Sequence, residues 1–149
     1  MKRGKVKNVI GVDLGGTHIR VGLIKGRKVV KYLKVKTPKS RSEILKNIVD
    51  MVSSVMTKKI SGVGVASPGP LKNGVIKNTP NLPLKNFNLQ KYLHDKLKKK
   101  VVVENDARCV ALSELVYGVK KKNFIVLTLG TGVGGGIIVD GKQIGRAHV

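Results

Sequence analysis

Two glycine-rich turns, far apart in the sequence, each join a pair of short apolar segments. Their small residues are Gly15, Gly16 and Thr17 in the first turn and Gly130, Thr131 and Gly132 in the second. Such turns leave backbone N–H groups unpaired, and the missing side chains let a phosphate group approach closely. Two turns of this kind can grip one polyphosphate from both sides, which predicts a nucleotide-binding site.

An acidic residue, Asp13, ends the apolar segment before the first turn. Mg²⁺ favours one or two carboxylates and keeps most of its water, so Asp13 is the candidate metal ligand beside a bound polyphosphate. Each turn alone is equally well explained as a tight hairpin, but the pair with its adjacent acid favours phosphate binding. The second turn is followed by a strand-like segment, which excludes a dinucleotide fingerprint, and a Gly-Lys-Ser/Thr phosphate loop is absent from the sequence.

The two turns belong to an internal repeat. A shift of 115 positions aligns the segment 9–24 with 124–139, and each copy is a strand, a small-residue turn and a second strand. The next hairpin turn also matches, since Lys25-Gly26 aligns with Asp140-Gly141. The pattern predicts a protein built from two related halves.

The elements that must position these residues follow from periodicity and turn residues. We expect helices over 42–56, 89–97 and 107–116, with Ser40 or Ser42 capping the first, and loop over most of 71–88. The expected strands are 8–13, 19–23, 28–36, 60–66, 101–103, 124–129 and 136–139. Asn105 and Asp106 lie at a strand-to-helix junction, where either could simply cap the helix and where a carboxylate could also face a cleft.

The composition limits the class of protein. Apolar residues make up 41% of the 149, enough for a real core, and the formal net charge is +22. We interpret the charge as a solvated lysine surface, because arginines and stacking aromatics are few, and a basic nucleic-acid-binding fragment is the weaker alternative. The single cysteine excludes an internal disulfide and a cysteine-based zinc site, and neither a signal peptide nor a membrane span is visible, so a cytoplasmic protein is expected.

Several ordered motifs carry a family resemblance across residues 8–142. They are Val12-Asp-Leu-Gly-Gly-Thr17, Gly64-Val-Ala-Ser-Pro-Gly69, Asn81-Leu-Pro83, Glu104-Asn-Asp-Ala107 and Leu129-Gly-Thr-Gly-Val-Gly-Gly-Gly136. In this order they resemble the ROK family of repressors, open reading frames and sugar kinases. The resemblance implies an α/β protein with the actin-like, ribonuclease-H-like ATPase fold, and it implies ATP and Mg²⁺ as cofactors.

The resemblance also implies roles for individual residues. Asp106 would be the base that accepts a proton from a sugar hydroxyl, while Asn81 and Asn105 would bind the sugar. The implied activity is that of an ATP-dependent hexose kinase of the glucokinase type. A sugar-sensing repressor of the same family is the alternative. The first expected strand begins at residue 8, which leaves no room before it for a helix-turn-helix and so favours the kinase. The oligomeric state stays open, with a homo-oligomer as one possibility.

The resemblance further predicts the domain organisation. We expect a complete first domain over 1–117 and an incomplete second domain over 118–143 that ends after two strands with an unpaired edge. The later sugar-binding Glu and His of the family and its structural zinc site are not found, so we expect this chain alone to be inactive. Residues 144–149 can be encoded by ATC GGA AGA GCA CAC GTC, which matches a common sequencing adapter, and we expect this tail to be an artefact.

Overall fold

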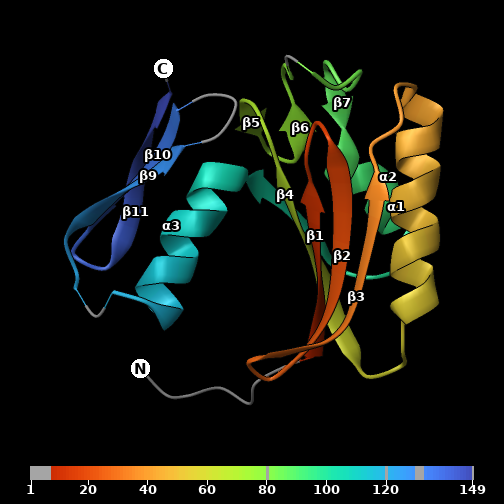
Figure 1. Ribbon diagram of the computed structural model, residues 1–149, viewed down its shortest axis with the longest axis horizontal. Coiled ribbons are helices and arrows are strands. Elements are labelled where there is room, and N and C mark those ends of the chain that lie inside the picture. Colours follow the sequence, from red (N-terminus) through yellow and green to blue (C-terminus); the bar gives the residue numbers. More distant parts are fainter. Residues whose placement is uncertain (1–7, 80, 120, 130–132, 149) are drawn as a thin grey trace. The chain divides into compact units, whose positions relative to one another are not determined.

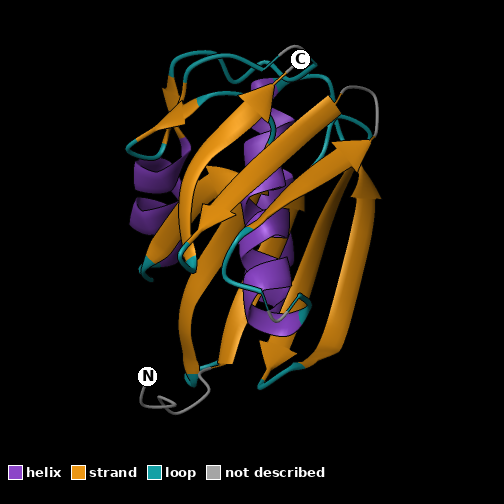
Figure 2. Ribbon diagram, turned by 90° about the vertical axis from the view of Figure 1, so that its left-hand side faces the viewer, coloured by secondary structure: helices purple, strands orange, loops and turns teal. Residues whose placement is uncertain are grey.

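The computed structural model describes residues 8–79, 81–119, 121–129 and 133–148. Strands predominate over helices in this part of the chain (Figure 2). The chain divides into two compact units, Met1–Glu104 and Asn105–Val149. The division precedes the boundary expected after residue 117, because the helix that follows Asn105 packs with the later strands.

The first unit is built on a five-stranded sheet with the order β3-β2-β1-β4-β8. Its strands are β1 (Asn8–Leu14), β2 (His18–Lys25), β3 (Lys28–Lys36), β4 (Ile60–Ser67) and β8 (Val101–Asn105). β1 is antiparallel to β2 and parallel to β4, and β2 is antiparallel to β3. β1 and β2 bury every second residue, as expected for strands with one face on a core, whereas the edge strand β3 is largely exposed and rich in lysine, which discourages pairing with another chain.

Helices α1 (Arg41–Val55) and α2 (Leu89–Leu97) cover one face of this sheet (Figure 1). Ser40 caps α1, because its hydroxyl oxygen accepts a hydrogen bond from the Glu43 amide at 3.3 Å. The hydroxyl also donates to the Glu43 carboxylate at 2.5 Å, which holds the two side chains together at the start of the helix. The buried face of α1 meets the apolar side of the strands through Ile44, Leu45, Ile48, Met51, Val52 and Val55.

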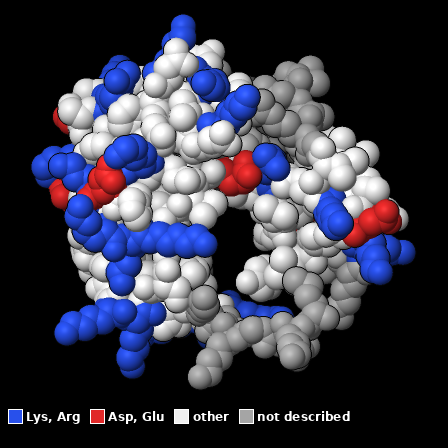
Figure 3. Space-filling model, turned by 180° about the vertical axis from the view of Figure 1, so that it is seen from behind, with Lys and Arg blue, Asp and Glu red and all other residues white. Residues whose placement is uncertain are grey.

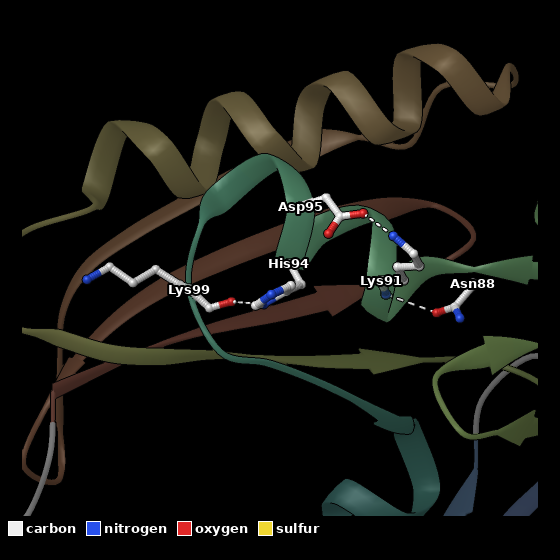
Figure 4. Close-up of polar contacts among 5 residues, drawn as sticks. All are labelled: Asn88, Lys91, His94, Asp95 and Lys99. Carbon is white, nitrogen blue, oxygen red and sulfur yellow. Dashed lines mark hydrogen bonds and ion pairs between the residues drawn. The ribbon is translucent and has the colours of Figure 1, made fainter.

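Polar contacts hold both ends of α2 (Figure 4). At its start the Asn88 side chain accepts a hydrogen bond from the Lys91 amide at 2.9 Å. Lys91 also pairs with Asp95 one turn later, and this hydrogen bond lowers the pKa of the Asp95 carboxyl. At its end His94 Nδ1 hydrogen-bonds the Lys99 carbonyl oxygen at 2.8 Å, and Lys98 adopts a left-handed conformation with φ of 52°. These contacts end the helix and direct the chain into β8.

A small sheet lies in the segment expected to be mostly loop. Its strands β5 (Leu71–Lys72), β6 (Val75–Ile76) and β7 (Phe87–Asn88) pair in the order β5-β6-β7. Most of the described residues of 71–88 are loop, as expected, and only these three stretches depart from the prediction. Strands of two residues are too short to show an alternating pattern. Ile76 is fully buried and ties this sheet to the core of the first unit.

The second unit contains one helix and a three-stranded antiparallel sheet with the order β11-β10-β9. Its elements are α3 (Asp106–Tyr117), β9 (Phe124–Leu129), β10 (Val133–Val139) and β11 (Lys142–His148). The expectation of two strands with an unpaired edge was wrong, since β11 pairs with β10 from Val139 to Gly134. The artefactual origin expected for residues 144–149 stays a prediction.

The internal repeat is visible as two antiparallel three-stranded meanders, β1-β2-β3 and β9-β10-β11. The second hairpin of each meander turns at a glycine with positive φ, which is 65° at Gly26 and 70° at Gly141. An L side chain is disfavoured in this conformation, so glycine serves both turns. The prediction of two related halves is confirmed at the level of topology.

Close packing explains the glycines that follow the second turn. A Cβ built on Gly136 would lie 2.4 Å from Ala111 Cβ, and one on Gly134 would lie 3.2 Å from Ala107 Cβ. The helix α3 therefore rests directly on the backbone of β10. Its two buried residues are the small Ala107 and Ala111, which is the physical reason that α3 belongs with the second unit.

The opposite face of this sheet exposes large apolar side chains. Ile125, Leu127 and Leu129, here called the β9 stripe, have exposed fractions of 65%, 65% and 82%. They alternate along β9 with residues that face α3, so all three lie on one side. The second unit thus presents a solvent-facing apolar surface.

On the face of the molecule shown in Figure 3, basic side chains lie at many separate places. Two of the acidic ones, Asp50 and Asp95, pair with a lysine one helical turn away. The interpretation of the net charge as a solvated lysine surface stays a prediction. Among the described residues, no helix is both long and apolar enough to cross a membrane.

Candidate functional site

The first predicted phosphate turn connects β1 to β2 and is folded by its own backbone. The Gly15 amide donates to the His18 carbonyl at 3.0 Å. Two of the three carbonyls of the turn accept hydrogen bonds from Thr37, that of Gly15 from the hydroxyl at 2.7 Å and that of Thr17 from the amide at 2.9 Å. Within the described part of the chain, nothing accepts a hydrogen bond from the amides of Gly16 and Thr17, and both residues are exposed. Two unpaired N–H groups are what an anion-binding turn requires.

Asp13, the predicted metal ligand, forms an ion pair with Arg20 directly across the β1–β2 ladder. The Arg20 guanidinium donates to Asp13 Oδ2 at 2.6 Å, and the Asp13 side chain is 48% exposed. The same hydrogen bond raises the pKa of Arg20. Arg20 is a site neighbour that sequence reasoning missed, although opposite charges seven residues apart across a tight hairpin were a usable signal.

Asp13 offers one carboxylate to a candidate Mg²⁺ site. The described residues contain no cluster of three or more carboxylate, histidine or cysteine side chains. This excludes an all-protein cage among them, but it suits an ion that keeps its waters and takes most other ligands from phosphate oxygens. Asp13 Oδ1 is not used by Arg20, so one carboxylate oxygen fits a magnesium ion that arrives with a nucleotide.

His18 follows the turn and lies among cations on the exposed face of β2 and β3. Partial loss of hydration lowers its pKa below 6.5, and the charges of Lys34, Arg20 and Lys36 lower it further. The folded state therefore disfavours the protonated ring. The free energy of unfolding therefore decreases as the pH falls below 6.5, because the unfolded chain then takes up a proton at His18 more readily than the folded chain does.

We expect the His18 ring to titrate below pH 6.5 in an NMR titration, and its pKa to rise when pyrophosphate is added. The rise follows because a bound anion offsets the nearby positive charges. The resonances of His94 in α2 serve as the control and should not move with pyrophosphate. A His18 pKa at or above the ordinary value, or one indifferent to pyrophosphate, would contradict this expectation.

Asn81, a predicted sugar ligand, lies against the phosphate turn. A Cβ built on Gly16 would lie 3.4 Å from Asn81 Cβ, so the two residues are in contact range. Asn81 is exposed, while Leu82 and Thr79 beside it are buried and the Thr79 hydroxyl donates to the Leu82 carbonyl at 2.6 Å. Buried neighbours thus hold an exposed amide beside the turn, an arrangement suited to binding a ligand hydroxyl.

At the junction of β8 and α3, the structure shows which of Asn105 and Asp106 caps the helix. The Asn105 side chain is the helix cap, since it accepts from the Arg108 amide at 3.2 Å and is only 2% exposed. Asp106 is exposed at the first helical position, and its Oδ1 accepts from the Ala107 amide at 2.8 Å and from Asn105 Nδ2 at 3.1 Å. These bonds orient the carboxylate and leave Oδ2 as a proton acceptor. The role of Asn105 as a sugar ligand stays a prediction.

The second predicted phosphate turn, Gly130, Thr131 and Gly132, lies outside the described residues. Of the other predicted residues, Asp13, the first turn and Asn81 belong to the first unit, and Asn105 and Asp106 belong to the second. The structure brings Gly16 together with Asn81 and Asn105 together with Asp106.

Comparison with protein-family models gives a match over residues 9–148 to the model described as "ROK family". The chain belongs to the ROK family. Its fold is the actin-like ATPase fold of ROK sugar kinases, as the resemblance implied.

Relatives in this family include a kinase and a repressor. The chain is 34% identical to a glucokinase of Thermotoga maritima, over 89% of this chain and 45% of the relative. It is 29% identical to a xylose repressor of Caldicellulosiruptor bescii, over 92% of this chain and 38% of the relative. The chain thus spans about half the length, or less, of these curated ROK relatives.

Among solved ROK structures, the chain resembles a glucokinase from Streptomyces griseus in complex with glucose and AMPPNP. The TM-score is 0.82 and the sequence identity is 31%, over 92% of this chain and 46% of that one. Nearly all of this chain therefore matches a part of that glucokinase, and this part is about half of its length.

Proposed function

We propose that the protein is an ATP-dependent hexose kinase and that this chain carries its catalytic base and both of its phosphate turns. The observation that carries the proposal is the Asp106 carboxylate. Because Asn105 caps α3, Asp106 is not needed for that task, and two hydrogen bonds fix the Oδ1 atom of this exposed residue. A carboxylate held in this way is suited to accept the proton of a sugar hydroxyl.

The proposed reaction is phosphoryl transfer. The sugar hydroxyl gives its proton to Asp106, the hydroxyl oxygen forms a bond to the γ-phosphorus of ATP, and the bond from that phosphorus to the bridging oxygen breaks to release ADP. Asn81 binds a hydroxyl of the sugar, and the amides of Gly16 and Thr17 bind phosphate oxygens. Mg²⁺, when bound, neutralises charge that develops on the phosphates. Asp13 is the residue that would hold this ion.

Similarity to a glucokinase and to a structure that contains glucose and AMPPNP supports this proposal. Glucose is accordingly the first substrate to test. The donor is taken as ATP on the same basis.

A repressor relative makes a second function of the same family worth separating by experiment. A sugar-responsive repressor would bind sugar and DNA and would transfer no phosphate. The net charge of +22 is compatible with such DNA binding, although the basic residues are scattered along the sequence.

The test is phosphoryl transfer by the complete protein with Mg²⁺, ATP and a panel of hexoses, followed by ³¹P NMR. We expect stoichiometric ADP and sugar phosphate with glucose and no sugar phosphate without added hexose. Tight glucose binding accompanied by salt-sensitive DNA binding, with no transfer to any hexose, would reject the kinase in favour of the repressor.

A further inference from the structure

We propose that Thr37 is a positioning residue that locks the phosphate turn in its anion-binding orientation. The inference rests on the proposed function, because the turn is proposed to bind the phosphates of ATP. It starts from two hydrogen bonds between residues far apart in the sequence, from the Thr37 hydroxyl to the Gly15 carbonyl at 2.7 Å and from the Thr37 amide to the Thr17 carbonyl at 2.9 Å.

The hydrogen bond from the Thr37 hydroxyl to the Gly15 carbonyl fixes the direction of the next amide, because the peptide group is planar. The carbonyl of Gly15 and the amide of Gly16 belong to one trans peptide group, in which C=O and N–H point in opposite directions. A hydroxyl that holds the carbonyl on the Thr37 side therefore turns the Gly16 N–H away from Thr37. This N–H is one of the two amides of the turn that have no acceptor in the described part of the chain.

The lock is needed because the turn is intrinsically permissive. Two successive glycines, Gly15 and Gly16, can rotate the peptide between them at little steric cost. A flipped peptide would present a carbonyl oxygen where the amide should be and would repel a phosphate. Thr37 opposes this flip from outside the turn, and it leaves the glycines small enough for close approach of the ligand.

The chain places Thr37 for this contact by strand pairing. β3 pairs with β2 up to the register of Lys36 with His18, so the residue that follows β3 lies beside the turn. Pro38 follows, and a residue before proline is held in extended conformation. Thr37 is half-buried there, where water competes less for the Gly15 carbonyl.

The experiment compares Thr37→Val, which keeps the shape but removes the hydroxyl, with Thr37→Ser, which keeps the hydroxyl. The matched control is Ser54→Ala, which removes one side-chain hydrogen bond to a carbonyl, that of Met51, within α1. In the complete protein we expect Thr37→Val to raise the KM for ATP about five- to tenfold. The Kd for glucose and the thermal midpoint should match those of Ser54→Ala, and Thr37→Ser should restore the KM for ATP to within about twofold of wild type.

A KM for ATP unchanged by Thr37→Val would overturn the proposal, and so would a Thr37→Ser variant as weak as the valine variant. A second measurement needs no nucleotide: the ¹⁵N–¹H residual dipolar coupling of Gly16 reports the direction of its N–H bond. We expect wild type and Thr37→Ser to share one value and Thr37→Val to depart from it, and equal values in all three would also overturn the lock. If wild-type protein binds no ATP, the proposed function fails, whereas the coupling still decides whether Thr37 holds the peptide.

Discussion

Replacement of Asp106 by Asn is expected to lower kcat for hexose phosphorylation by about 10²- to 10⁴-fold. Asparagine keeps an oxygen that can accept from the Ala107 amide and from Asn105 Nδ2, so the local geometry should survive. It is not basic enough to take the proton of the attacking hydroxyl. The measurement is steady-state kinetics of the complete protein with saturating glucose and ATP, together with the Kd for glucose, which should change little.

Asp140→Asn provides the control for the loss of a carboxylate. Asp140 is exposed in the same unit at a φ of 50°, a conformation that asparagine also tolerates, and it lies in the turn between β10 and β11. This variant should retain wild-type kcat. Wild-type turnover by Asp106→Asn would show that Asp106 is not the base and would remove the central support of the kinase proposal.

The second large effect is expected on stability, from Gly69→Ala. Gly69 follows β4 with a φ of 83°, and a Cβ built on it would lie 2.1 Å from the Asn78 carbonyl oxygen. The unfavourable φ and the close contact both involve backbone atoms, so rotation of a side chain cannot relieve either of them. We expect the free energy of unfolding to fall by roughly 2–4 kcal/mol in chemical denaturation.

Two other glycines separate the causes of this loss. Gly26 has a φ of 65° and Gly64 does not have positive φ, and a Cβ on either would meet nothing within 4 Å. Gly26→Ala should therefore lose about 1 kcal/mol from conformation alone, and Gly64→Ala should change stability by less than about 0.5 kcal/mol. A Gly69→Ala variant no less stable than Gly26→Ala would show that the segment before Asn81 relaxes freely.

The sequence predicted the parts of the fold that have a long, regular pattern. The helix α1 and the strands β1, β2 and β3 lie where apolar periodicity placed them, and β9 and β10 of the second unit were anticipated through the repeat, whereas β11 was not. Alternation over seven or more residues is a strong signal because burial of one sheet face imposes it. The three strands β5 to β7 carry no such signal at two residues each.

Other features depend on contacts that a sequence does not display. Asn105 and Asp106 are both good helix caps, and only the fold shows that the first residue takes the cap and leaves the second exposed. The helix α3 packs through Ala107 and Ala111 instead of large side chains, so its sequence did not show which sheet it joins. Nothing in the sequence distinguishes Thr37 from other threonines after a strand, because its contact with Gly15 depends on the β2–β3 register.

The β9 stripe makes the dispersion of this protein in water depend on ionic strength. Three apolar side chains on one sheet face favour contact between copies, while a formal charge of +22 drives copies apart. Repulsion reaches about 10 Å at 0.1 M salt but only about 3 Å at 1 M. Added salt therefore weakens the repulsion that opposes contact between β9 stripes of two copies. We expect self-association to increase with salt concentration and to be lowest in dilute buffer.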